Sequence, residues 1–123
     1  MQTFIQLGLR LDLSVARGAT LGPFVVTVTN PDGTAADLTD VIPEGHVVAS
    51  DEVTEEAAFS FDSSDLSAGV FAFQLAADQT DGLESSPLNF QPIHYWSVRL
   101  RWPDGSITPC YYGALRTIRG IGL

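Results

Sequence analysis

The side chains that could carry catalysis or hold a metal are few and far apart in the sequence. His46 and His94 are the only imidazole bases, Cys110 is the only thiol, and the chain has no lysine. A serine hydrolase needs a nucleophile, a base and an orienting acid, and neither histidine is accompanied by a Gly-x-Ser-x-Gly turn. A zinc site needs ligands in closely spaced groups, which these three residues do not form. We therefore expect no catalytic residue, no metal site and no cofactor.

Acidic residues offer two further kinds of chemistry. Calcium prefers several carboxylate oxygens, and Asp62, Asp65, Asp78 and Asp81 lie in two stretches that we expect to be loops. Neither stretch follows the twelve-residue calcium-loop pattern, so the simpler interpretation is that these aspartates hold turns. A glycosidase needs two carboxyl groups that face each other across a cleft, whereas the neighbours Glu55-Glu56 point to opposite sides of a strand. Bound calcium stays open, and no glycosidase pair is predicted.

Charge is distributed unevenly along the chain. The formal net charge is −9, and between Asn30 and Glu84 there are thirteen acidic residues and no arginine or lysine. From His94 onward the only acid is Asp104, against four arginines, namely Arg99, Arg101, Arg116 and Arg119. An acidic chain without lysine is a poor ligand for phosphate backbones, which predicts no nucleic-acid partner. The acidic half either keeps a solvated surface soluble or faces a basic neighbour, such as the arginines of the next copy.

The elements that must position these residues are short strands. Apolar and polar residues alternate through most of the chain, and turn residues interrupt the alternation at intervals of about 8 to 15 residues. This pattern predicts an antiparallel sandwich or barrel. The residues expected to point inward are Leu11, Leu13 and Val15, then Phe24, Val26 and Val28, then Phe59 and Phe61, then Phe71, Phe73 and Leu75, and finally Trp96, Val98, Leu100 and Trp102.

Proline and glycine mark where the chain reverses. The segments 30–33 and 103–105 each combine a proline with a glycine, which predicts tight turns. The stretch 77–83 is too short for an independent helix and is expected to form one turn over the end of the sandwich. Pro109 cannot donate to a strand ladder, so the expected strand over 106–112 lies at an edge or contains a bulge. A final strand is expected over 114–118.

Length and composition are those of one folded domain. With 123 residues, 45% of them hydrophobic, the chain can bury an ordinary core without a metal or a disulfide. We expect a single β-sandwich domain over 1–123, with a short lead at 1–9 and a tail at 119–123. No apolar run is long enough to cross a bilayer, and the first residues lack the pattern of a secretory signal. We therefore expect no membrane partner.

Several short motifs together resemble one known family. They are Arg17-Gly18-Ala19-Thr20 before a strand, Asp32-Gly33 followed by Ala36-Asp37-Leu38-Thr39, a turn centred on Thr80, Tyr95-Trp96-Ser97-Val98-Arg99, and Pro103-Asp104-Gly105 leading to Tyr112-Gly113-Ala114-Leu115. From about residue 10 to residue 119, the chain resembles the immunoglobulin-like N-terminal domains of phage baseplate upper proteins and related tail proteins. The resemblance implies a single all-β, immunoglobulin-like antiparallel β-sandwich that packs against other virion proteins. It also implies a location in the virion, after synthesis in the cytoplasm of a bacterial host.

The resemblance leads us to expect a non-enzymatic structural or assembly protein of a tailed-phage particle. Members of the family often carry a fibre behind this domain, and since the sequence stops at Leu123 we expect a baseplate, tail-adaptor or decoration role. The expected partners are other virion proteins and copies of the chain in a symmetric assembly. The expected interface residues are Arg99, Arg101, Tyr111, Tyr112, Arg116, Arg119, Ile121 and Leu123. The alternative is a carbohydrate-binding or adhesin-like sandwich, in which exposed tyrosines stack on sugar rings.

Overall fold

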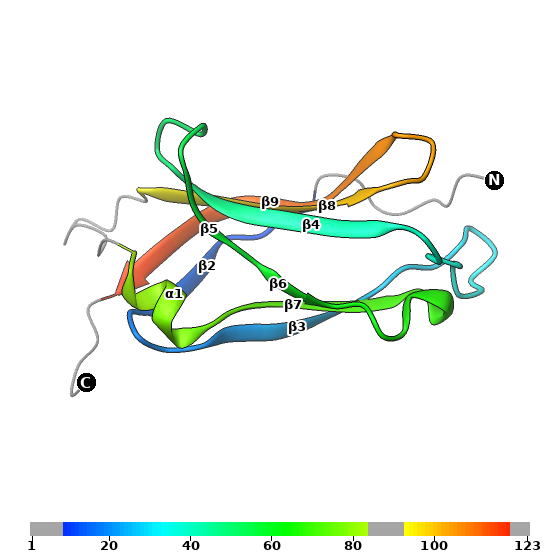
Figure 1. The fold of residues 1–123 in the computed structure, drawn as a ribbon, viewed down its shortest axis with the longest axis horizontal. Helices are drawn as coiled ribbons and strands as arrows, with labels where there is room; N and C mark the ends of the chain where they lie inside the picture. The colour runs from blue at the N-terminus through cyan, green and yellow to red at the C-terminus, as the bar shows by residue number, and fades with distance from the viewer. Residues whose placement is uncertain (1–8, 84–92, 119–123) are drawn as a thin grey trace.

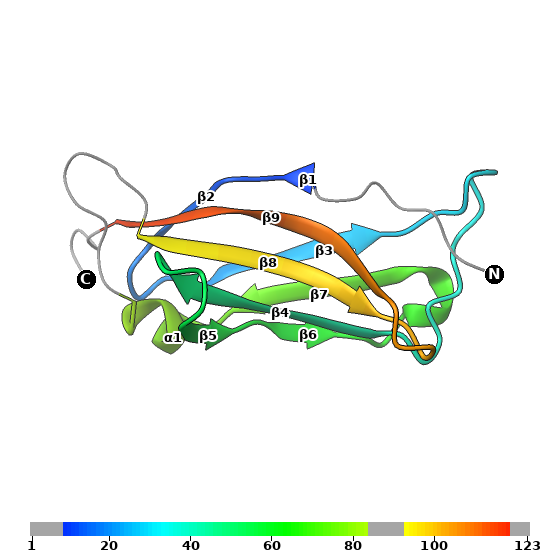
Figure 2. The same cartoon turned by 90° about the horizontal axis from the view of Figure 1, so that it is seen from above.

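Two β-sheets packed face to face make up the protein (Figures 1 and 2). The computed structural model describes residues 9–83 and 93–118. The strands are β1 (Leu9–Arg10), β2 (Leu13–Ala16), β3 (Leu21–Thr27), β4 (Ile42–Ala49), β5 (Glu55–Ala58), β6 (Ser60–Asp62), β7 (Val70–Leu75), β8 (His94–Arg101) and β9 (Ile107–Ile118). Two short helices, the 3-10 helix η1 (Leu66–Ala68) and α1 (Ala77–Asp81), flank β7. The predicted all-β sandwich is confirmed.

The order of the strands differs between the two sheets. The larger sheet runs β1-β9-β8-β4-β5, with β2 also on β9, and the smaller sheet runs β3-β7-β6. In variable-type immunoglobulin domains a three-strand sheet is likewise extended beyond one edge strand, as β5 here extends the sheet β9-β8-β4 beyond β4. Pairing is antiparallel except that β1 and β2 run parallel to β9. Cys110 is the only cysteine, so no disulfide within the chain can link the two sheets, and aromatic rings pack between them.

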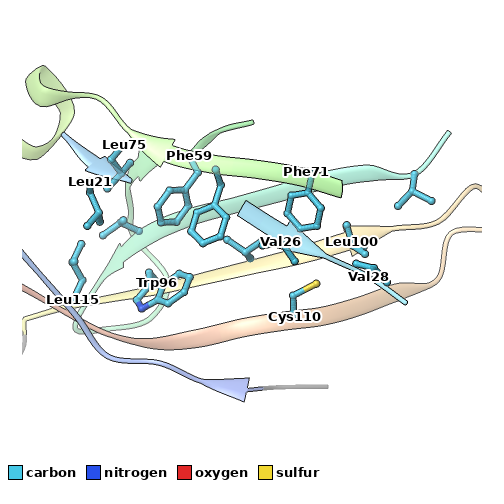
Figure 3. Close-up of a cluster of buried hydrophobic side chains, with 14 of the residues drawn as sticks. Leu21, Val26, Val28, Phe59, Phe71, Leu75, Trp96, Leu100, Cys110 and Leu115 are labelled. Carbon is cyan, nitrogen blue, oxygen red and sulfur yellow. The ribbon is translucent and has the colours of Figure 1, made fainter. Parts of the chain in front are cut away.

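The core is built from the alternating residues of both sheets (Figure 3). Trp96 is 2% exposed and stacks on Phe73 with ring centroids 5.8 Å apart, while Phe59 meets both rings edge-on. Val26, Phe71 and Leu75 come from the smaller sheet, and Val98 and Leu100 come from the larger one. Every second residue is buried in 71–75 and 96–100, which confirms the inward faces predicted there. In 24–28, Val26 and Val28 are buried as predicted, and Phe24 is half-buried against the core.

The N-terminal and C-terminal strands differ from the prediction in two places. Leu11 is 43% exposed and not buried beside Val15, because the chain bends between β1 and β2 where the Asp12 carboxylate accepts a hydrogen bond from the Ala114 amide. The two strands expected over 106–112 and 114–118 are one strand, β9. Gly113 does not interrupt it, since its missing side chain is what lets the Leu11 carbonyl lie against β9.

Pro109 lies where β9 changes its register against β8. The ladder shifts between Val98 and Arg99, which pair with Tyr111 and Pro109, so that Cys110 is the extra residue of a bulge. The predicted bulge is therefore confirmed. Tyr111 and Tyr112 do not lie at a sheet edge, however, because β1 pairs with them on their other side.

A short helix closes one end of the sandwich, as expected for 77–83. The buried Thr80 hydroxyl donates to the Ala19 carbonyl at 2.7 Å and accepts from the Gly18 amide at 3.1 Å. Arg17 donates to the Asp81 carbonyl at 2.7 Å. These bonds fasten α1 to the loop between β2 and β3. In the described part of the chain, no helix has the length and hydropathy to span a membrane.

Four turns share one local motif, an aspartate followed two residues later by serine or threonine. The aspartate carboxylate accepts from both the backbone amide and the hydroxyl of that second residue, with amide contacts of 2.8 to 3.0 Å. The pairs are Asp32 and Thr34, Asp37 and Thr39, Asp62 and Ser64, and Asp104 and Ser106. The hydroxyl bond first, and then the amide bond, lowers the pKa of each of these four carboxyls.

These turns predict a loss of stability in acid. A carboxyl whose folded pKa lies below its unfolded pKa of about 3.9 stabilises the fold above that pH, and this stabilisation is lost as the pH falls through the folded pKa. We expect the urea midpoint to stay level from about pH 7 to pH 5 and to drop below about pH 4. Replacing the four aspartates by asparagine keeps a side chain that favours such turns but removes the titration, so it should shrink the acid drop. A midpoint that stays level down to about pH 3 would contradict this account.

Candidate interaction surface

The outer face of the larger sheet, called here the large face, gathers the arginines. Residues opposite each other on neighbouring strands share a face. One cross-strand row is Glu44, Arg99 and Pro109, and the next is Ile42, Arg101 and Ile107. Further along, His46, Ser97, Tyr112 and Arg10 form a row, and Ser14 pairs with Arg116. Four of the five arginines in the described residues therefore lie on this face, the fifth being Arg17.

Arg99 and Arg101 are held in place by one carboxylate. Glu44 Oε1 lies 2.6 Å from Arg99 Nε and 3.0 Å from Arg101 Nη2, and its other oxygen lies 3.3 Å from Arg101 Nε. The hydrogen bond from Arg101, followed by the contact with Arg99, lowers the pKa of Glu44. Two guanidinium groups share one carboxylate, so this group of three carries a net positive charge. Their side chains remain 42% and 46% exposed and can bind a further anion or carbonyl.

Apolar side chains are mixed with these charges. Of the eight large hydrophobic residues most exposed in the described structure, four lie on the large face, namely Ile42 at 57%, Ile107 at 38%, Tyr112 at 45% and Ile118 at 49%. The outer face of the smaller sheet differs, since its β3, β6 and β7 residues carry no arginine and only Val25 is a large exposed hydrophobic. Exposed aliphatic and aromatic groups beside arginine are typical of protein interfaces.

A trough lies on the large face. It has a volume of about 280 Å³, and its lining includes Arg10, His46, Glu52, Tyr95 and Tyr112. The small side chain of Ser97 and the bare backbone of Gly113 lie between these larger residues, which leaves the surface hollow there. This volume is at or below the lower limit of the range for small-molecule pockets, about 300 Å³.

The predicted interface residues divide into three groups. Arg99, Arg101, Tyr112 and Arg116 lie together on the large face. Tyr111 lies on the opposite side of the same sheet, half-buried and stacked on Trp96 with ring centroids 6.4 Å apart. Arg119, Ile121 and Leu123 lie outside the described residues.

Sequence reasoning missed other residues of the large face, including Arg10, Ile42, Glu44 and Ile107. Ile42, Glu44 and Ile107 each lie next to a buried residue of their own strand. Ile42 and Glu44 flank the buried Pro43, and the period of two in 42–48 could have identified both. Arg10 could not be found this way, because its face depends on parallel pairing with β9.

No protein-family model and no curated protein matches the sequence.

Each of the two histidines lies next to a glutamate. His94 is buried, and its Nδ1 lies 2.5 Å from Oε1 of Glu56, whose side chain is 26% exposed. Glu56 reaches inward because the β4-β5 ladder shifts register between its neighbours Glu55 and Ala57. His46 lies on the large face, 3.8 Å from Glu55. Each imidazole thus has a carboxylate partner.

The other candidate groups in the described residues are the Cys110 thiol and the acidic side chains. Burial raises the pKa of the Cys110 thiol to about 11, so the group is almost entirely in its unreactive, protonated form at neutral pH. Across residues 9–83 and 93–118, no three or more histidine, cysteine, aspartate or glutamate side chains are placed to hold a metal ion together. Asp62, one of the calcium candidates, accepts the turn bonds from Ser64 described above.

Proposed function

We propose that this protein is a non-enzymatic assembly module that binds other proteins through the large face. The observation that carries the proposal is the combination, on one sheet face, of four arginines with the exposed Ile42, Ile107, Tyr112 and Ile118. Arginine and tyrosine are enriched among the residues that contribute most to binding at protein interfaces. Burial of an exposed isoleucine side chain against a partner also favours binding, because apolar surface is removed from water. A β-sandwich beneath them provides a rigid support that does not need to reorganise on binding.

We further propose that the assembly is a tailed-phage virion, as a baseplate, tail-adaptor or decoration component. This step is supported by the resemblance to the immunoglobulin-like domains of phage baseplate upper proteins and by the extension of the sheet β9-β8-β4 by β5. The partners would be other virion proteins and copies of the chain, with neither nucleic acid nor membrane involved. The net charge of −9 agrees with a protein partner better than with a phosphate backbone.

Native mass spectrometry of the protein, alone and mixed with the structural proteins of its particle, tests this proposal. Tyr112→Ala and Ile42→Asp on the large face should each weaken binding of the partner by about tenfold or more. Val25→Asp on the smaller sheet is the matched control, since Val25 is 69% exposed, and it should leave binding unchanged. A protein that stays monomeric and binds no particle protein would overturn the proposal, as would loss of binding only in Val25→Asp.

A carbohydrate-binding module is the second candidate, and the trough is the observation that favours it. Tyr95 and Tyr112 border a hollow with Arg10 as a donor and Glu52 as an acceptor, and this combination can stack on a sugar ring and bond its hydroxyls. Binding on a glycan array that Tyr95→Ala abolishes, without any stable protein complex, would favour this candidate over the first.

A further inference from the structure

The turn between β4 and β5 projects from the sandwich on the side of the large face (Figure 1). Val53 at this turn is 81% exposed, the largest exposure among the large hydrophobic residues of the described structure. Its neighbours Asp51, Glu52 and Glu55 are acidic, and no arginine or lysine lies between 30 and 83. The turn, called here the acidic tip, therefore offers an apolar side chain surrounded by negative charge.

The opposite end of the large face has the complementary character. Ile42 and Ile107 are exposed there and lie in one cross-strand row with Arg101, next to the row of Arg99. We call these four residues the Arg-Ile end. Because Glu44 neutralises only one of the two arginines, this end keeps a positive charge. An apolar group with acidic neighbours thus matches an apolar pair with basic neighbours.

Strand length separates the two ends. Ile42 begins β4 and the acidic tip follows its last residue, so the two lie at opposite ends of an eight-residue strand, about 26 Å apart. A two-fold axis in the plane of the face, across the strands at their middle, would place the acidic tip of each copy on the Arg-Ile end of the other. The same rotation would place Asp104, on the β8-β9 turn, over the end that carries Arg116 and Ile118.

The area of the large face is compatible with a dimer. The strands of this sheet contain 38 residues in all, and at about 3.3 Å of length and 4.8 Å of width per residue they cover roughly 600 Å², or about 1,200 Å² when two copies are counted. This area is at the lower limit for specific complexes, so a weak and salt-sensitive dimer is expected.

We propose that a second copy of this chain docks face to face on the large face, with the acidic tip of each copy against the Arg-Ile end of the other. The inference rests on the proposed function and names a partner for the same surface. Its two contacts are identical by symmetry, so the assembly closes as a dimer and does not grow into a filament.

Sedimentation equilibrium up to about 1 mM protein tests the dimer. Val53→Arg should raise its dissociation constant by at least about tenfold, since a positive charge replaces the apolar contact and faces the arginines of the other copy, and higher salt should raise the constant of the unaltered protein as well. Val25→Arg adds the same charge at an exposed valine of the smaller sheet and should leave the constant unchanged. A monomer at every concentration, or an equal effect of the two valine variants, would overturn the proposal.

A charge exchange tests the contact itself. Glu52→Arg and Arg101→Glu should each weaken the dimer, and the double variant should recover at least part of the loss, because the two charges then attract again. A double variant as weak as the sum of both changes would refute the arrangement. If the chain is monomeric while Ile42→Asp still abolishes binding of another particle protein, the dimer is refuted and the proposed function stands.

Discussion

Trp96→Ala is expected to lower the free energy of unfolding by about 3–5 kcal/mol, out of a total of about 5–15 kcal/mol for a domain of this kind. The indole ring is 2% exposed and lies between Phe73, Phe59 and Tyr111, so its removal leaves a cavity between the two sheets. Its Nε1 also donates to the Leu11 carbonyl at 2.9 Å, a bond that holds the bend between β1 and β2 against β9. Unfolding in guanidinium chloride measures this change in the free energy of unfolding, provided that the denaturant slope m is the same for both proteins.

Trp102→Ala is the matched control for this prediction. Trp102 is half-buried at the end of the sandwich, where its Nε1 donates to Thr108 Oγ1 at 2.8 Å. We expect this change to cost about 1–2 kcal/mol, because less area and one hydrogen bond are lost. Trp96→Phe should fall between the two, since it keeps a ring in the core but leaves the Leu11 carbonyl without its donor. If the two alanine variants lose the same free energy of unfolding, Trp96 does not contribute more to the core than Trp102 does.

Strict alternation made most of the fold predictable from the sequence. In 71–75 and 96–100 every second residue is apolar, and each strand is buried on one face only, so local order and three-dimensional position agree. The bend at Leu11 was not predictable, because it depends on the Asp12 carboxylate meeting the Ala114 amide, a contact across 102 residues of sequence. The parallel pairing of β1 and β2 depends on the same distant strand.

The candidate surface was predictable in part for the same reason. Arg99 and Arg101 alternate with Val98 and Leu100, so their outward direction follows from the local pattern. Tyr111 and Tyr112 are adjacent, and two adjacent strand residues cannot share a face. The bulge at Pro109 and Cys110 decides which of the two points outward, and its register is fixed only by pairing with β8. Glu44, which gathers both arginines, comes from 55 residues away in sequence.

Gly69→Ala is expected to cost about 3 kcal/mol or more, because two independent effects add. Gly69 ends η1 with a φ of 78°, a left-handed conformation that a residue with a Cβ adopts at a cost of about 1–2 kcal/mol. A Cβ there would also lie 2.6 Å from the Val28 carbonyl oxygen and 2.8 Å from that of Ala36. Both belong to the crossing where the Val28 amide donates to Gly69 and the Ala36 amide donates to Val28.

Gly33→Ala separates the two effects at Gly69. Gly33 has a φ of 89°, but a Cβ there would meet no atom within 4 Å, so only the conformational cost of about 1–2 kcal/mol is expected. The difference between the two variants in urea unfolding therefore measures the crowding at the crossing alone. If the backbone at Gly69 can move away from Val28 and Ala36 at no cost in free energy, the two variants will be equally stable. In that case the loop over 28–36 would not be held by its approach to Gly69, and the close packing at this end of the sandwich would not contribute to stability.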